Sequence, residues 1–408
     1  AGALVHAQKT LEAIKRKGAD AVLEYAKQFK ELKEGEEAVV DKARLKAAYE
    51  GMSAEDRACL ERVASRIRAF AEAQRNALES RMETSIPGGK AGHGVRAVEV
   101  AGCYAPGGRY PLPSSVLMTC VTARAAGVPH VVLCSPNPAP ATLAAAYVSG
   151  ADAVLAIGGA HAIGAMALGA FGPRCDVIAG PGNKWVTAAK ALVSTWTGID
   201  MLAGPSEVLV LCDDTADPVT VAADLLAQAE HDVVARPILV CFGEKASEVV
   251  EEVNAELETQ LATLPTKAVA APAVEGGFAV ACATVEEAVA VSDAVAPEHL
   301  EVMCRNAQAV ADACNHYGGL FIGAGAAEVL GDYGIGPNHT LPTAGTARYT
   351  GGLSVFNFLR VRTWMRLDDL PAAKGALHDA VTLARHEGLE AHARAAERRL
   401  LLASDSSG

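Results

Sequence analysis

The strongest constraint on the fold is a repeated alternation of short apolar runs with alanine-rich segments of helical character. Nine such runs follow one another between residues 96 and 323: RAVEVAGCYAP, HVVLCSPN, AVLAIGG, DVIAGPGN, EVLVLCDD, PILVCFGE, GGFAVACA, LEVMC and GLFIG. Strands that alternate with helices predict βαβ units and parallel sheets. Because nine strands are many for one sheet, we predict an α/β protein with two Rossmann-like domains and mostly parallel sheets.

The two ends of the chain have a different texture. Residues 1–85 carry apolar and charged residues at three-to-four spacing, which predicts helices, and a similar pattern returns from about residue 368. We therefore expect helical N-terminal and C-terminal segments. The predicted domains are residues 1–103 with 208–354, residues 104–207, and a C-terminal helical extension over residues 355–408.

Composition narrows the classes of protein. Of 408 residues, 50% are hydrophobic and 21% are charged, which indicates a globular chain with a large core. A net charge of −12 argues against nucleic-acid binding, since that binding needs Lys and Arg to neutralise phosphates. No apolar stretch is long enough for a transmembrane helix, and the N-terminal residues do not form a signal-peptide pattern.

Cysteine spacing bears on the compartment. The ten cysteines are widely spaced, form no CxxC motif, and several lie inside apolar runs. Such residues behave as small buried hydrophobes, so we expect reduced thiols and a cytoplasmic protein, with a removed organellar transit peptide as the alternative.

Three glycine-rich segments follow predicted strands and are candidate nucleotide sites: residues 104–111, 157–164 and 179–186. Ligands of α/β sheets bind beyond the carboxyl ends of strands, and helix N-termini there can hold phosphates. Neither GxGxxG nor GxxxxGK[ST] is present, so the alternative is a set of tight turns without a ligand.

Two polar segments suggest chemistry. In DLLAQAEHD, a predicted helix places Gln228 and His231 three residues apart on one face, where they could bind one metal ion; an ordinary helix end is the alternative. In APEHLEVMC, Glu298 and His299 directly precede or begin a predicted strand. That pair suits proton transfer near neutral pH, and a solvated turn is the alternative.

Two further segments complete a candidate metal site. The long loop 331–345 carries Asp332 and His339, and the helical segment 384–396 carries Glu387 and His392, which could equally be surface residues. Gln228, His231, Asp332 and His392 together offer nitrogen and oxygen donors without thiolate. Such a set suits zinc or a related divalent ion.

These segments together resemble the histidinol dehydrogenase family over about residues 20–403. The motifs that carry the resemblance are YAPGGRYPLPSSVLM, GGAHAIGAMALGAFG, AGPGNKWVTAAK, IDMLAGPSEVLVL, LLAQAEHD, APEHLEV, GDYGIGPNHTLPTAG, YTGGLSV and EGLEAHARAA. The resemblance implies a zinc-dependent, NAD-linked oxidation of L-histidinol to L-histidine through histidinal, the last two steps of histidine biosynthesis. It also implies an intertwined homodimer with shared active sites and one Zn²⁺ per subunit.

The resemblance assigns roles to individual positions of this chain. It implies metal ligation by Gln228, His231, Asp332 and His392, the last from the partner subunit, and acid–base catalysis by Glu298 and His299. It implies NAD contacts at Tyr104, His161 and Asn183. Substrate contacts are implied at Ser206, His339 and Glu387, besides the metal ligands and Glu298.

Three segments depart from the family pattern. His161 stands where the family commonly has Gln, DVVARP replaces a Gly/Pro/Asp-rich stretch, and FLRVRTWMRL is similar to relatives that oxidise other diols, such as a sulfonated propanediol. Since GPSEVLV is more similar to the histidinol enzymes, we favour histidinol as the substrate. The alternatives are a diol dehydrogenase of the related kind and a non-catalytic zinc-binding assembly protein on the same scaffold.

Overall fold

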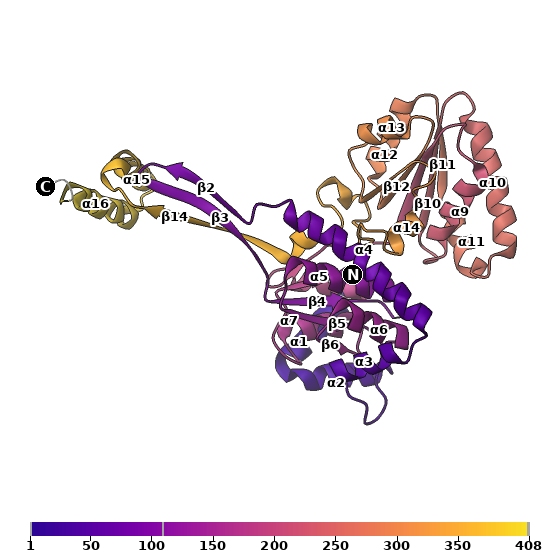
Figure 1. The fold of residues 1–408 in the computed structure, drawn as a ribbon, viewed down its shortest axis with the longest axis horizontal. Helices are drawn as coiled ribbons and strands as arrows, with labels where there is room; N and C mark the ends of the chain where they lie inside the picture. Colours follow the sequence, from indigo (N-terminus) through magenta and orange to yellow (C-terminus); the bar gives the residue numbers. More distant parts are fainter. Residues whose placement is uncertain (1, 108–109, 406–408) are drawn as a thin grey trace. The chain divides into compact units, whose positions relative to one another are not determined.

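The structure is a computed structural model that describes residues 2–107 and 110–405. Gly108 and Arg109, inside the predicted glycine-rich segment 104–111, lie outside the described residues. The chain divides into two compact units, Ala1–Arg75 with Val98–Phe358 and Asn76–Ala97 with Leu359–Gly408. Figure 1 labels many of the helices and strands of both units.

The first unit contains two sheets, and the first of them has six strands in the order β1-β6-β5-β4-β7-β8. Only β1 is antiparallel to its neighbour. The strands are β1 (Val39–Val40), β4 (Val100–Tyr104), β5 (His130–Cys134), β6 (Ala153–Leu155), β7 (Val177–Ala179) and β8 (Gly198–Ile199).

Helices connect these strands and cover them. They are α1 (Gly2–Lys17), α2 (Ala19–Gln28), α3 (Lys42–Glu50), α4 (Ala54–Asn76), α5 (Pro113–Ala126), α6 (Pro140–Ser149), α7 (Gly159–Leu168) and α8 (Lys184–Val193). Nearly every residue of α5 and α7 is buried, as expected for helices that are apolar on all sides. The outer helix α1 packs on α7 and α8, and a Cβ at Gly164 would lie 2.6 Å from Ile14 Cδ1.

The second sheet has five parallel strands in the order β11-β10-β9-β12-β13. They are β9 (Glu207–Cys212), β10 (Arg236–Phe242), β11 (Phe278–Cys282), β12 (His299–Met303) and β13 (Gly319–Ile322). Counted along the chain, this order repeats the order β6-β5-β4-β7-β8 of the first sheet. The two sheets are therefore duplicates at the level of topology.

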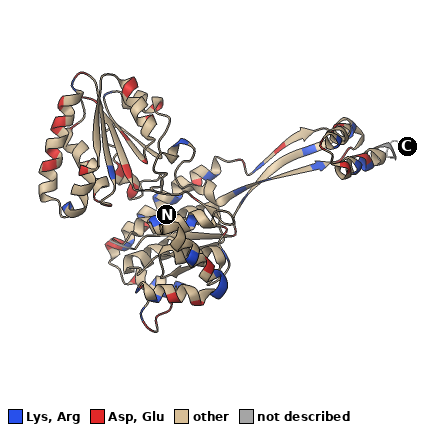
Figure 2. Ribbon diagram, turned by 180° about the vertical axis from the view of Figure 1, so that it is seen from behind, with Lys and Arg blue, Asp and Glu red and all other residues tan. Residues whose placement is uncertain are grey.

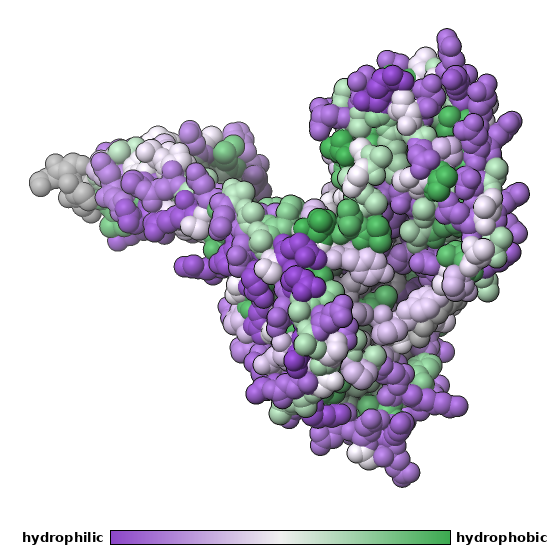
Figure 3. Space-filling model, turned by 45° about the vertical axis from the view of Figure 1, so that its right-hand side comes forward, coloured by the Kyte–Doolittle hydropathy of each residue, from purple (hydrophilic) through white to green (hydrophobic). Residues whose placement is uncertain are grey.

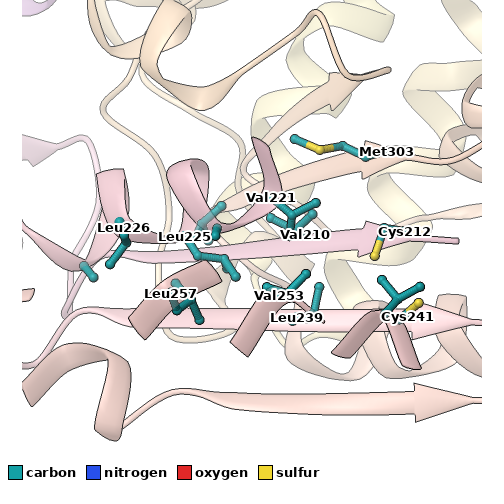
Figure 4. Close-up of a cluster of buried hydrophobic side chains, with 14 of the residues drawn as sticks. Val210, Cys212, Val221, Leu225, Leu226, Leu239, Cys241, Val253, Leu257 and Met303 are labelled. Atoms are coloured by element: carbon teal, nitrogen blue, oxygen red, sulfur yellow. The ribbon is translucent and has the colours of Figure 1, made fainter. Parts of the chain in front are cut away.

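Helices lie on both faces of this sheet (Figure 1). They are α9 (Pro218–Ala229), α10 (Ala246–Thr263), α11 (Lys267–Glu275), α12 (Val285–Val295), α13 (Ala307–Ala313) and α14 (Glu328–Asp332). Val210, Leu239 and Met303 pack with α9, α10 and α11 on one face (Figure 4), and Leu209, Val240 and Val302 pack with α12 and α13 on the other. Strands buried on both faces explain the uninterrupted apolar runs in the sequence.

The second unit is a three-stranded antiparallel sheet followed by two helices. The sheet order is β14-β3-β2, with β2 (Arg81–Ile86), β3 (Gly89–Ala97) and β14 (Leu359–Leu367). The helices α15 (Lys374–His386) and α16 (Glu390–Asp405) pack on each other. Short 3₁₀ turns lie at Thr346–Arg348, Val355–Phe358 and Pro371–Ala373.

The sheet of the second unit has two unlike faces. Arg362, Trp364 and Arg81 lie on one face, where the Arg81 guanidinium is 5.5 Å from the Trp364 ring centroid. Lys and Arg residues mark the strands in Figure 2. Val361 and Met365 lie on the opposite face, and 75% of Met365 is exposed.

The structure confirms the α/β class and the parallel sheets, because all nine predicted runs are strands in them. Residues 1–85 are not wholly helical, since β1 and most of β2 lie there, and FLRVRTWMRL forms the unpredicted strand β14. The partners of β1 and β4 lie within residues 104–207, although the prediction grouped residues 1–103 with 208–354. The division into three domains stays a prediction.

In the described ranges, none of the helices combines the length and the apolar character that crossing a membrane requires. Hydrophilic residues cover most of the face drawn in Figure 3, with hydrophobic residues between them.

Candidate functional site

One candidate site lies at the amino edge of the second sheet. His299 begins β12 and Glu207 begins β9, and the two strands are hydrogen-bonded neighbours. The helix α9 ends at the same edge, because a helix that follows one parallel strand returns to the start of the next. This edge is opposite to the one where ligands of open α/β sheets usually bind.

His299 is the most constrained residue of the site. The Nδ1 atom of its buried imidazole lies 3.0 Å from the Glu207 carbonyl oxygen. A carbonyl can only accept, so Nδ1 carries the proton and Nε2 is the basic nitrogen. Nε2 is buried and has no hydrogen-bond partner among the described residues. Burial lowers the pKa of His299 to about 4, so the imidazole is neutral at ordinary pH.

Glu298 is also buried, and its Oε2 accepts a hydrogen bond of 2.9 Å from the Glu207 backbone N–H. Burial raises the pKa of Glu298 well above its usual range. The predicted alternative, a solvated turn at Glu298 and His299, is therefore wrong. A neutral base and a carboxyl group of raised pKa stand side by side.

Gln228 lies in the last turn of α9, 1% exposed. With its amide nitrogen turned toward Glu328, Gln228 donates a hydrogen bond of 2.8 Å to Oε1 of that residue. This orientation leaves the amide oxygen available to a ligand. The prediction placed His231 in the same helix, but α9 ends at Ala229, and His231 lies in a turn in which its N–H donates to the Gln228 carbonyl oxygen.

Asp332 lies between two imidazoles. Its Oδ2 is 3.4 Å from His231 Nε2, and its Oδ1 is 3.7 Å from His339 Nδ1. Burial alone would raise the pKa of Asp332, but the hydrogen bond to His231 and the neighbouring imidazoles lower it. The same bond raises the pKa of His231. The structure therefore brings together two of the four predicted metal ligands, His231 and Asp332.

The donor chemistry of this group fits a divalent cation. One ligand atom each from His231, Glu328 and Asp332 lies within 4.8 Å of the others. One nitrogen and two oxygen donors, with the Gln228 amide beside them, are ligands that zinc accepts. Glu328 was not predicted as part of this site.

Buried carboxyl groups extend behind the site and were also missed from the sequence. Glu328 is buried, and its backbone N–H donates a 2.6 Å hydrogen bond to Glu301 Oε1. Burial, together with the charge of Asp224, raises the pKa of Glu301 to about 8. One signal was available: Glu301 is an acidic residue within the apolar strand HLEVM, and Asp224 lies four residues before Gln228 on an apolar helix.

A second cluster lies at the carboxyl edge of the first sheet. The hydroxyl oxygen of Tyr104, the last residue of β4, lies 3.2 Å from the Gly159 N–H, which donates to it. His161 follows in the first turn of α7, and its buried Nε2 is 2.7 Å from Glu31 Oε2. Two of the three predicted NAD contacts therefore stand close together.

The third predicted NAD contact, Asn183, is the N-cap of α8, and its side-chain oxygen accepts a 3.0 Å hydrogen bond from Trp185 N. The Trp185 ring meets His6 edge to face at 5.0 Å between centroids. The rings of Tyr25 and Phe29 lie nearly parallel to the His161 imidazole, with centroids 5.9 and 5.6 Å away. Aromatic side chains thus connect the starts of α7 and α8.

The remaining predicted residues are less constrained. Ser206 is half-buried just before β9, at the same edge as His299. Glu387 and His392 are exposed in the second unit, near the turn between α15 and α16. Their roles stay predictions.

Comparison with known proteins gives one family. The sequence model of histidinol dehydrogenase matches residues 3–400. Histidinol dehydrogenase of Cupriavidus pinatubonensis is 40% identical over 399 residues, which cover 95% of this chain and 89% of the relative. Histidinol dehydrogenase of Natronomonas pharaonis is 42% identical over 393 residues, 95% of this chain and 91% of the relative. These relatives favour the histidinol enzymes over the diol dehydrogenase alternative.

Solved structures agree. The crystal structure of histidinol dehydrogenase from Elizabethkingia anophelis superposes with a TM-score of 0.89 at 34% identity, covering 97% of this chain and 91% of that one. An acetylating aldehyde dehydrogenase from Geobacillus thermoglucosidasius, at 14% identity and a TM-score of 0.50 over 90% of this chain and 97% of its own, shares the fold alone. The chain belongs to the histidinol dehydrogenase family, a family of oxidoreductases of histidine biosynthesis.

Proposed function

We propose that this chain catalyses the zinc-dependent, NAD-linked oxidation of L-histidinol to L-histidine through histidinal. The single observation that carries the chemistry is the buried Nε2 of His299, which has no partner among the described residues and is held as the basic nitrogen. A buried atom without a hydrogen bond is costly unless a ligand completes it. The hydroxyl group of an alcohol substrate is such a ligand.

In the first oxidation, His299 Nε2 accepts the proton of the substrate hydroxyl group as a hydride leaves the carbon that carries this hydroxyl group. NAD supplies the hydride acceptor, once for each of the two oxidations. The hydrogen bond from Nδ1 to Glu207 fixes the ring in the orientation that aims Nε2 at its proton. Alcohol and oxidised cofactor thus become aldehyde, reduced cofactor and one proton.

The second oxidation begins with the addition of water to the aldehyde. Glu298 is suited to take a proton from that water because burial raises the pKa of its carboxyl group, which makes its carboxylate a stronger base. His299 would again accept a hydroxyl proton, now from the hydrate, and a second NAD would supply the hydride acceptor. Water, aldehyde and oxidised cofactor become carboxylate, reduced cofactor and protons.

Gln228, His231 and Asp332 would hold the metal ion, with His392 of the partner subunit as a fourth ligand and Glu328 orienting the Gln228 amide. A zinc ion held there would supply a positive charge that anchors and orients the substrate. Ser206 and His339 would contact the substrate from this subunit, and so would the partner subunit's Glu387. Fixed orientation can lower a barrier by several kcal/mol.

Tyr104, His161 and Asn183 would contact NAD. The support for this proposal is the Rossmann-like strand order and the position of Tyr104 and both helix starts at the carboxyl edge. A Cβ at Gly180, just after β7, would lie 2.1 Å from the Tyr104 carbonyl oxygen, so the backbone approaches closely here.

We infer that the protein is an intertwined homodimer with shared sites. Besides the family resemblance, the support is the apolar face of the second unit's sheet, where Val361 and Met365 are 58% and 75% exposed. A second copy of the chain would bury these side chains.

The test is the yield of NADH from L-histidinol and excess NAD⁺. We expect about two NADH and one L-histidine per L-histidinol, abolished by a chelator and restored by Zn²⁺. A His130→Asn variant, altered at an exposed histidine, is the control and should keep full yield. An absence of NADH with L-histidinol from the zinc-loaded protein would contradict the proposal.

A further inference from the structure

We propose that Glu31 selects NAD over NADP by placing a carboxylate where the adenosine ribose binds. The inference rests on the proposed NAD-linked function and adds a specificity residue to it. Glu31 lies between α2 and β1, in a segment that carries none of the predicted cofactor contacts.

The position of Glu31 follows from its contacts at Gly158. A Cβ at Gly158 would lie 3.1 Å from Glu31 Oε1 and 2.7 Å from both Cβ and Cγ of Pro136. Gly158 is the N-cap of α7 and closes the turn after β6, and Pro136 follows β5. The carboxylate therefore stands at the carboxyl ends of the second and third strands of the Rossmann-like sheet.

The carboxyl ends of the strands are where Rossmann folds bind dinucleotides. The chain order reverses between β4 and β7, so the switch point of the sheet lies beside β4, the neighbour of β5. In Rossmann folds an acidic residue near the end of the second strand accepts hydrogen bonds from the adenosine ribose hydroxyls. Here the second strand, β5, is followed by Ser135, Pro136 and Asn137, none of them acidic. Glu31 supplies the carboxylate from a distant part of the chain.

Glu31 is held in place by contacts of its backbone and of one carboxylate oxygen. Its Oε2 is bound to His161 Nε2, and its backbone N–H donates to the Ala26 carbonyl oxygen. Among the described residues, Oε1 accepts no hydrogen bond and no Lys or Arg pairs with the carboxylate.

The negative charge of the Glu31 carboxylate would favour the binding of NAD over that of NADP. The free ribose hydroxyl groups of NAD can donate to Oε1. The 2′-phosphate of NADP would bring negative charge against the carboxylate, with no described cation paired there to compensate. His161, at the position where the family commonly has Gln, completes this arrangement by donating to Oε2 when Nε2 is protonated.

The test is titration of the zinc-loaded protein with NAD⁺ and NADP⁺ by calorimetry, without substrate. We expect NAD⁺ to bind at least about tenfold more tightly than NADP⁺, and Glu31→Gln to reduce that ratio to about threefold or less. Glu34→Gln, which removes an exposed charge from the same segment, should keep the wild-type ratio.

An unchanged ratio in Glu31→Gln would overturn the inference and leave the proposed function standing. Failure of wild-type protein to bind either nucleotide would overturn both. If Glu31→Gln does not fold, the same titrations of the wild-type protein at low and high salt concentration test the inference, because salt screens the repulsion between like charges. The NADP⁺-to-NAD⁺ ratio of Kd values should fall at high salt, and a constant or rising ratio would overturn the inference.

Discussion

At His299, burial sets the charge of the imidazole, and a hydrogen bond sets which of its nitrogens carries the proton. Burial disfavours the protonated ring and lowers its pKa to about 4, while the Glu207 carbonyl oxygen fixes the proton on Nδ1. The neutral ring with a free Nε2 is therefore the state at neutral pH. Glu298, one residue earlier, has a pKa shifted the other way, so adjacent groups of the chain are suited to different proton transfers.

Glu298→Gln separates these two tasks. We expect the oxidation of supplied histidinal to fall by roughly 10²-fold, because no carboxylate remains to activate water, and the oxidation of histidinol to histidinal to fall much less. Rapid measurement of NADH formation in each half-reaction checks this. Equal losses in both would contradict the role of Glu298 in water activation.

Glu301→Gln tests the buried carboxyl groups behind the site. The folded-state pKa of about 8 lies above the value of an exposed glutamate, so folding favours the protonated group. Its contribution to the free energy of unfolding is present below about pH 4.5 and is lost as the pH rises toward 8. The variant should match wild type near pH 5 and be more stable by on the order of 3 kcal/mol at pH 8.

Urea unfolding at the two pH values measures this difference. Glu258→Gln, at an exposed site on α10, is the control and should show no such pH dependence relative to wild type. Parallel pH profiles for Glu301→Gln and wild type would mean that Glu301 is not protonated in the folded protein.

At the scale of elements, the strands that are buried on both faces could be predicted from the sequence. The strands β3 and β14 of the second unit could not. Runs such as EVLVLC carry their own signal, because both faces of a parallel strand are apolar. The strand β3, GKAGHGVRA, and the basic strand β14 lack that signal. The alternation of arginine with apolar residues in LRVRTWMRL is the period-two pattern that could have revealed β14.

The candidate site shows the same limit. Motifs singled out His231, Glu298, His299 and Asp332 within their own segments. Glu31 and Glu328 reach their partners through the fold: Glu31 lies 130 residues from His161, and the orientation of Glu328 depends on how α14 packs. No local pattern encodes such contacts.

Gly180→Ala tests the turn that joins β7 to α8. Gly180 has a φ of 129°, and a Cβ there would lie 2.1 Å from the Tyr104 carbonyl oxygen. The added methyl group should lower the free energy of unfolding by about 2 kcal/mol or more and weaken NAD⁺ binding. Thermal denaturation and calorimetry measure the two effects.

Gly243→Ala is the matched control. Gly243 also has a positive φ, 105°, but nothing lies within 4 Å of its Cβ position. It should show the conformational cost alone and bind NAD⁺ as wild type does. Equal effects at both positions would show that the close approach to Tyr104 has no consequence for the cofactor.

At the scale of the whole molecule, the proposed site would combine residues from two copies of the chain. Gln228, His231 and Asp332 belong to the first unit, while Glu387 and His392 are exposed in the second. The proposal supplies His392 from a second copy. A site divided between chains makes activity depend on association.

Mixing two inactive variants tests this division. A dimer that combines a His392→Ala subunit with a Gln228→Ala subunit has one site with both residues intact. Unfolding and refolding an equimolar mixture should restore about a quarter of the wild-type activity, for random pairing of two chains with one intact site per hybrid. Recovery no greater than that of each variant refolded alone would contradict the shared site.

The central claim is that Nε2 of His299 is the base of the first oxidation. His299→Asn tests it most directly, because the shorter amide keeps a donor near the Nδ1 position and loses the nitrogen at Nε2. In a single turnover with L-histidinol and NAD⁺, we expect NADH formation to slow by roughly 10³-fold, with zinc content and melting temperature unchanged. A rate within about threefold of wild type, in a variant that retains its zinc, would contradict the account.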